Sequence, residues 1–117
     1  MNSENSLEWK RGDFHFKWNG KEFATPDVLF WAFELPSNAG VVIVTLIDET
    51  TPRDKTNGYV FFPEAGYKEI NIKEGNQTVH FLFCYYEQGY LVFAGANSTE
   101  YLLDPKTLTV IKSRYYR

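Results

Sequence analysis

The sequence has little of what a disulfide-bonded, secreted or membrane-spanning protein needs. Its 117 residues include one cysteine, Cys84, so an internal disulfide is excluded and a reducing compartment is expected. The first ten residues are polar and contain no apolar signal segment. The best apolar run, residues 41–47, is far shorter than the roughly 18 residues of a membrane-spanning helix. These absences predict a cytoplasmic protein that does not contact a membrane.

Catalytic chemistry is equally sparse. The two histidines, His15 and His80, have no nearby cluster of metal-ligating residues, and Cys84 lies in an apolar segment rather than the electropositive setting of a nucleophile. No nucleophile elbow, glycine-rich phosphate loop or zinc-protease motif is present. Asp48 and Glu49 are adjacent, so on a strand end their side chains point in opposite directions. We therefore predict a protein that is not an enzyme and that binds no cofactor and no metal.

Charge is unevenly distributed along the chain. The formal net charge is −3. Residues 27–104 contain 11 acidic and 4 basic residues, a balance of −7, whereas residues 105–117 contain 4 basic residues and no acidic one. Because phosphate binding needs a basic face, the acidic central part disfavours direct binding of nucleic acid and suits a basic partner. Ordinary solubility is the alternative explanation of the same charge.

The chain has enough apolar material to fold by itself. Hydrophobic residues make up 44% of the sequence and aromatic residues 18%, which is too apolar for a disordered chain. The length is that of one domain. We therefore predict a single domain over residues 1–117, in which residues 1–8 are a flexible tail.

Residues 13–23 (DFHFKWNGKEF) carry the clearest local pattern. Aromatic and polar residues alternate there with the period of a half-buried strand. Asn19 and Gly20 then supply the two positive-φ positions of a type I′ turn. The pattern predicts a hairpin in which Phe16 faces Phe23.

Other segments extend the pattern of short strands and turns. Residues 27–35 (DVLFWAFEL) are apolar at odd and even positions, which indicates a strand covered on both faces or, alternatively, a short helix. Residues 41–48 are rich in β-branched side chains and predict a central strand, followed by a long polar loop over 49–58. Residues 78–94 predict a second hairpin, with a three-residue connection at 87–89.

Turn signals recur every 8 to 12 residues, and no long helical stripe is present. This spacing predicts an all-β fold: an antiparallel β-sandwich, or a curled, half-barrel sheet, of about eight to nine short strands with little helix. Unpaired sheet edges leave the oligomeric state open.

The C-terminal half resembles small bacterial proteins built from meanders like the blades of a β-propeller. Residues 89–93 (GYLVF) are followed by 100–107 (EYLLDPKT) and then by Val110-Ile111, as in a strand that ends in Asp-Pro-x-Thr-Gly, a turn and a last strand. Leu108 stands where such a turn usually has glycine. Small proteins of this kind include immunity proteins of contact-dependent inhibition and other polymorphic toxin systems. The resemblance implies an immunity protein that binds and neutralises a cognate toxin, with a nuclease as the expected kind.

An acidic and tyrosine-rich surface would suit such a role. Toxins that act on nucleic acid are basic at the active site, so acidic residues could occupy them, and tyrosine gives large contact area at low entropic cost. Tyr85 and Tyr86 are consecutive on one strand, so one of them is expected to face outward. The predicted partner-binding residues are Asp48, Glu49, Asp54, Glu64, Glu69, Glu74, Tyr85, Tyr86 and Glu87. The alternative function is a small-molecule-binding β domain in which the sheet encloses an aromatic pocket.

Overall fold

The structure is a computed structural model that describes residues 6–116. Within these residues the chain forms antiparallel strands and one 3-10 turn (η1, Pro36–Asn38), with no α-helix. The all-β prediction is therefore confirmed, and the helical alternative for residues 27–35 is wrong, since β4 occupies Leu29–Glu34. The described residues form 13 strands rather than the predicted eight or nine. The excess includes strands of two residues, which are too short to show an alternating pattern.

The strands form three consecutive meanders and one small hairpin, and within each meander neighbours in the sequence are neighbours in the sheet. The first sheet contains β1 (Leu7–Glu8), β2 (His15–Trp18) and β3 (Lys21–Ala24). The second contains β4 (Leu29–Glu34), β5 (Val41–Thr45), β6 (Gly58–Phe62) and β7 (Gly66–Glu69). The third contains β10 (Phe81–Glu87), β11 (Tyr90–Gly95), β12 (Thr99–Leu103) and β13 (Val110–Tyr115). The small hairpin is β8 (Lys73–Glu74) and β9 (Gln77–Thr78).

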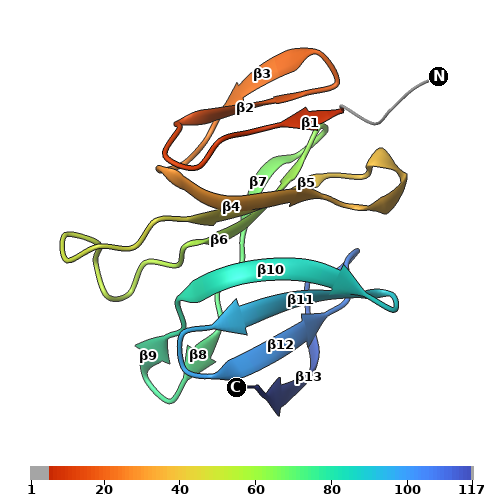
Figure 1. Ribbon diagram of the computed structural model, residues 1–117. Helices are drawn as coiled ribbons and strands as arrows, with labels where there is room; N and C mark the ends of the chain where they lie inside the picture. Colours follow the sequence, from red (N-terminus) through yellow and green to blue (C-terminus); the bar gives the residue numbers. More distant parts are fainter. Residues whose placement is uncertain (1–5, 117) are drawn as a thin grey trace.

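The three meanders stack in layers and do not close into a barrel (Figure 1). The β4–β7 sheet lies in the middle, with β1–β3 on one face and β10–β13 on the other. The predicted antiparallel stacking of sheets is thus confirmed, but the stack has three layers, whereas a β-sandwich has two. Each meander returns along its own sheet, so stacking buries the apolar faces without long crossover connections.

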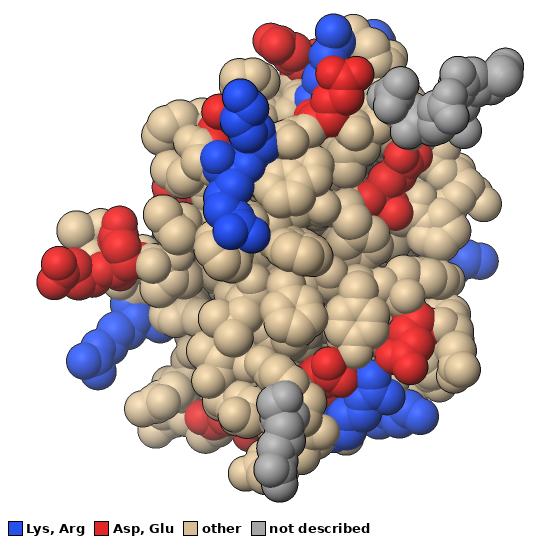
Figure 2. Space-filling view, viewed as in Figure 1, with Lys and Arg blue, Asp and Glu red and all other residues tan. Residues whose placement is uncertain are grey.

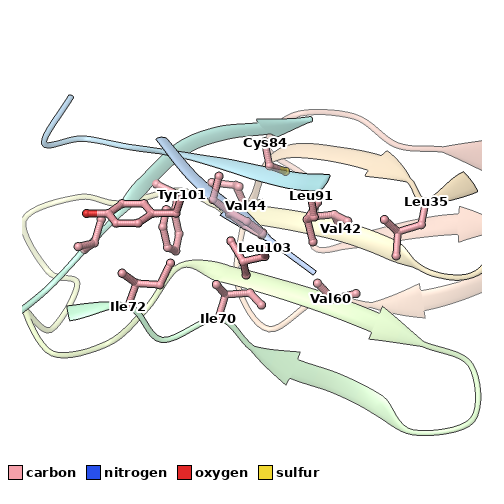
Figure 3. Close-up of a cluster of buried hydrophobic side chains, with 13 residues drawn as sticks. Leu35, Val42, Val44, Val60, Ile70, Ile72, Cys84, Leu91, Tyr101 and Leu103 are labelled. Atoms are coloured by element: carbon pink, nitrogen blue, oxygen red, sulfur yellow. The ribbon is translucent and has the colours of Figure 1, made fainter. Parts of the chain in front are cut away.

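Both faces of the middle sheet are buried, and this explains its unbroken apolar strand. Along β5, Val41 and Ile43 point to the cluster beneath β1–β3, whereas Val42 and Val44 point to the cluster beneath β10–β13. All four side chains have no exposed surface. Figure 3 shows the second cluster, where Val42 and Val44 meet side chains from the β10–β13 sheet. Each fully buried side chain of this size contributes about 1.5–3 kcal/mol to stability.

A buried amide connects the second and third sheets. The Asn57 side chain is almost fully buried, just before β6. Its Nδ2 donates to the carbonyl oxygens of Thr45, at 2.9 Å, and Phe81, at 2.8 Å. Its Oδ1 accepts the Phe81 amide hydrogen, with a nitrogen–oxygen distance of 2.8 Å. One side chain therefore satisfies three backbone groups at the end of β5 and the start of β10.

The expected hairpins are present, with one correction. Phe16 pairs with Phe23 across a turn in which Asn19 and Gly20 have φ values of 53° and 82°. In the second hairpin Glu87 pairs directly with Tyr90, so the connection has two residues rather than three. Gln88 and Gly89 have φ values of 51° and 88°, which is again a type I′ turn. The sequence pattern did not predict this turn type because its first position is glutamine, whereas type I′ turns usually have asparagine or aspartate there.

The two turns make a matched pair for mutagenesis. Asparagine tolerates the left-handed region better than glutamine does. We expect Gln88→Asn to raise the free energy of unfolding by about 0.5 kcal/mol and Asn19→Gln to lower it by a similar amount. Urea denaturation of the two variants measures both values, and a reversal of either sign would contradict the turn assignment.

Two further positions refine the sequence predictions. Leu7 and Glu8 pair with β2, so the predicted tail over residues 1–8 does not extend to them, and residues 1–5 lie outside the described part.

Leu108, at the usual glycine position, has a φ of 61°. The turn before β13 therefore has the positive φ that usually requires glycine, although the residue at this position is leucine. Its Asp104 side chain accepts the amide hydrogens of Lys106 and Thr107, with distances of 2.8 and 3.1 Å.

Candidate protein-binding site

The first strands of the three meanders lie on one side of the molecule. β1, β4 and β10 are each an edge strand of their sheet, and all three face the viewer in Figure 1. β10 lies against β4 across the boundary between the second and third sheets. This side therefore displays side chains from every layer of the stack.

Four aromatic side chains form a row across this side. Trp9 follows β1, Trp31 is in β4, and Phe83 and Tyr85 are in β10. The ring centroids are 6.5 Å apart for the two tryptophans, 5.9 Å for Trp31 and Phe83, and 6.2 Å for Phe83 and Tyr85. We call these four residues the aromatic row. All four side chains are partly exposed, so the row lies at the surface but is packed against neighbouring residues.

Trp31 fixes the centre of the row. Its Nε1 donates a hydrogen bond to the backbone oxygen of Cys84 in β10, at 2.8 Å. The bond joins two strand edges and satisfies an edge carbonyl that has no strand partner on that side. Because the polar atom of the indole is already used, the exposed part of the ring offers apolar contact area.

A cation lies beside the row on the neighbouring part of β4. The Arg11 guanidinium lies 4.5 Å from the centroid of the Phe30 ring. Arg11 Nε also donates to the Phe30 backbone oxygen, at 3.2 Å. Arg11, which precedes β2, therefore covers this part of β4.

A charged cluster lies at the Tyr85 end of the row. Arg114 in β13 donates to Glu87 Oε1 and to Glu100 Oε1, each at 2.7 Å, and its Nη2 lies 3.2 Å from Tyr85 Oη. Tyr85 Oη donates to Glu100 Oε2 at 2.8 Å. The hydrogen bonds to Glu87 and then Glu100 raise the pKa of Arg114. Partial burial, followed by the bond to Glu100, raises the pKa of Tyr85, which keeps its hydroxyl protonated as a donor.

The surface view shows the charge pattern of this side. In Figure 2 a broad region of uncharged residues crosses the middle of the molecule, and acidic and basic side chains lie at its margins. Protein interfaces likewise have a centre that is depleted of charged residues and a polar rim.

The structure disperses the predicted acidic residues. Asp48, Glu49 and Asp54 are exposed in the loop between β5 and β6, at one end of the sheets, whereas Glu87 ends β10 at the opposite end (Figure 1). Glu64 is exposed in the turn between β6 and β7. The nine predicted residues therefore do not make one continuous surface.

Several of these acids have local structural roles. Asp48 Oδ1 accepts the Thr50 amide hydrogen, at 2.8 Å, and the hydrogen bonds from Thr50 lower the pKa of Asp48. Glu69 accepts a hydrogen bond from the Asn71 side chain, at 3.2 Å. Glu74 accepts one from the Tyr101 hydroxyl, at 2.8 Å. Such bonds shape turns and hairpins, and they reduce the freedom of these carboxylates to bind a partner.

Among the predicted residues, Tyr85 belongs to the aromatic row, and Glu87 lies next to it through their shared contact with Arg114. Tyr86, on the opposite face of β10, pairs with the buried Leu91 and is 38% exposed. Sequence reasoning missed Trp9, Trp31 and Phe83. The available signal was the apolar residues at both parities of 27–35 and 78–86. For residues 27–35 this signal predicts a strand covered on both faces, and for 78–86 one arm of a hairpin, whereas β4 and β10 are both edge strands.

The histidines and Cys84 lie apart from one another. His80 Nε2 is 2.9 Å from the Lys55 backbone oxygen, and His15 Nε2 is 3.8 Å from Glu22 Oε2. Residues 6–116 contain no group of three histidine, cysteine, aspartate or glutamate side chains placed to hold a metal ion. In the same residues, no helix has the length and hydropathy needed to cross a membrane.

Cys84 behaves as a small core residue. It is fully buried in the cluster between the second and third sheets, and burial raises the pKa of its thiol well above the usual value. We expect a thiol reagent such as Ellman's reagent to label Cys84 at least 100-fold more slowly in the native protein than in urea. Rapid labelling of the native protein would show that the two sheets separate readily.

A hollow of about 360 Å³ lies beside the β5–β6 loop. It is lined by Arg53, Asp54, Asn76, Gln77, Thr78 and His80. These are polar side chains, in contrast to the aromatic pocket expected for the small-molecule alternative.

Comparisons of the chain with protein-family models, with curated proteins and with solved structures gave no match. The resemblance to immunity proteins stays a prediction.

Proposed function

We propose that the protein binds another protein through the face that carries the aromatic row. The row itself is the observation that supports this proposal. Two tryptophans, a phenylalanine and a tyrosine contact one another in sequence across three stacked sheets, and each keeps part of its surface exposed. Tryptophan and tyrosine are enriched among the residues that dominate binding energy at protein interfaces.

The fixed position of Trp31 also supports a protein-binding role for the row. Trp31 is held by its hydrogen bond to Cys84 and by contacts with both neighbouring rings. Side chains that are already fixed lose little conformational freedom when a partner binds. The row therefore offers apolar contact area at a low entropic cost.

We further propose that the partner is a basic protein and that the biological role is immunity: the neutralisation of a cognate toxin, with a nuclease as the first kind to test. The net charge of −3 favours association with a basic partner. Because the acids are dispersed, they would affect the rate of association and its salt dependence more than the final affinity. The resemblance in residues 89–111 is the reason for naming immunity.

A growth assay tests this proposal. The protein is co-expressed with the polypeptide encoded by the adjacent upstream reading frame. We expect the wild-type protein to restore growth, and we expect Phe83→Ala to weaken binding of that polypeptide at least tenfold, as loss of a central aromatic contact does. Phe14→Ala is the matched control, because Phe14 is 63% exposed and outside the row. An equal loss of affinity for that polypeptide in both variants, or no loss in either, would contradict a role for the aromatic row.

A further inference from the structure

β13 differs from the other strands of its sheet in how it is held. All six residues of β13 are exposed, whereas nearly all of the residues in β11 and β12 are buried. No β13 residue belongs to either buried cluster. The pairing with β12 is also interrupted, because the register shifts between Leu102 and Leu103. The strand is thus attached to the molecule mainly through its backbone.

Side-chain contacts add little to this attachment. Arg114 is bonded to Glu87 and Glu100, and the Lys112 ammonium lies 5.2 Å from the Tyr90 ring centroid. The Arg114–Glu87 pair joins side chains that are 43% and 39% exposed, and such a surface pair contributes little to stability. Segments with few buried apolar contacts open at low free energy. We therefore expect β13 to open more readily than the rest of its sheet.

Opening of β13 would leave a place with specific chemistry. The Glu100 side chain is 10% exposed and bonds to Arg114, so the loss of β13 would remove the cation that pairs with its carboxylate. The backbone groups of β12 that face β13 would also lose their partners. An extended segment satisfies the backbone, and a basic side chain opposite Glu100 satisfies the carboxylate.

We propose that β13 is an exchangeable strand, and that the partner contributes a basic, extended segment that takes its place beside β12. The proposal rests on the proposed function, since it names how the partner protein is recognised. The two surfaces are continuous, because Tyr85 at the end of the aromatic row donates directly to Glu100. Arg114 then occupies the position that a basic side chain of the partner would take.

A peptide copy of the strand tests this exchange in the full-length protein. The probe is a fluorescein-labelled peptide of residues 109–116 (TVIKSRYY), and its binding is measured by fluorescence anisotropy. We expect measurable binding to the wild-type protein. We expect about tenfold tighter binding to the Arg114→Ser protein, in which the internal competitor is weakened. Lys106→Ser, an exposed cation in the preceding turn, is the matched control and should leave binding unchanged.

Charge selectivity is the second part of the test. A peptide with the Arg114→Glu change should bind at least tenfold more weakly than the original peptide, and the Glu87→Gln protein should show a smaller difference between the two. Equal binding of the two peptides, or no binding of either to the wild-type and Arg114→Ser proteins, would overturn the proposal.

Hydrogen exchange of the wild-type protein needs no variant. The amides of β13 should exchange at least tenfold faster than those of β11. Equal protection of β13 and β11 would refute strand exchange. Because neither experiment substitutes a residue of the aromatic row, failure here would leave the proposed binding face standing, and the effect of Phe83→Ala on partner binding is measured separately.

Discussion

Asn57→Ala is expected to lower the free energy of unfolding by about 3–5 kcal/mol, the largest effect that we anticipate for a single polar residue. Asn57 makes three hydrogen bonds, all to the backbone of Thr45 and Phe81. Alanine would leave three buried backbone groups without a partner. Each such group costs free energy, because water cannot replace the lost bond in a filled core.

Urea denaturation measures this loss, with Asn71→Ala as the control. Asn71 is exposed, and its side chain donates to Glu69 on the surface. We expect the control to change stability by less than about 0.5 kcal/mol. A loss below about 1 kcal/mol for Asn57→Ala would mean that the second and third sheets do not depend on this amide.

Trp31→Ala is expected to cost about 3 kcal/mol, and Trp31→Phe about 1–2 kcal/mol. Alanine removes the contacts with Trp9 and Phe83 together with the hydrogen bond to Cys84. Phenylalanine keeps a ring at the position and removes the donor. The difference between the two variants therefore separates the apolar contacts from the hydrogen bond.

The same two variants separate stability from binding. If the row supplies the contact area for a partner, Trp31→Phe should bind nearly as well as the wild-type protein under conditions where both are folded, whereas Trp31→Ala should bind at least tenfold more weakly. Phe14→Ala should alter neither property. A folded Trp31→Ala protein with unchanged affinity would show that the partner binds elsewhere.

Sequence patterns predicted the local structure better than the layers. The Asn19-Gly20 turn and the Phe16–Phe23 pair follow from residues a few positions apart, and both are present. The β5 strand was predicted from its β-branched residues. Local chemistry determines such features because the interacting atoms are neighbours in the chain.

Features that depend on distant residues were missed. Trp31 and Phe83 are 52 positions apart, and nothing near either residue indicates that their rings meet at a sheet boundary. The sequence also could not distinguish a strand buried on both faces, such as β5, from an edge strand with a covered face, such as β4. Nor could the sequence show that Asp48, Glu49 and Asp54 lie at the end of the sheets opposite Glu87, because that placement depends on how the strands run.

The stacked arrangement gives a physical reason for the position of the site. Each meander begins with an edge strand on the same side, and edge strands carry unpaired backbone groups that invite contact. In this protein Trp31 and Phe83 contact each other where the β4 and β10 edges meet. A partner that packs on the aromatic row would therefore contact three sheets at once, through side chains that the core already holds in place.

Site-specific photo-crosslinking tests the central claim most directly. The photoreactive residue p-benzoyl-phenylalanine replaces either Phe83 in the row or Phe14, which is more exposed, and the protein is co-expressed with the product of the adjacent upstream reading frame. We predict a covalent adduct with that product from position 83 and none from position 14. An adduct from position 14 alone would contradict the account.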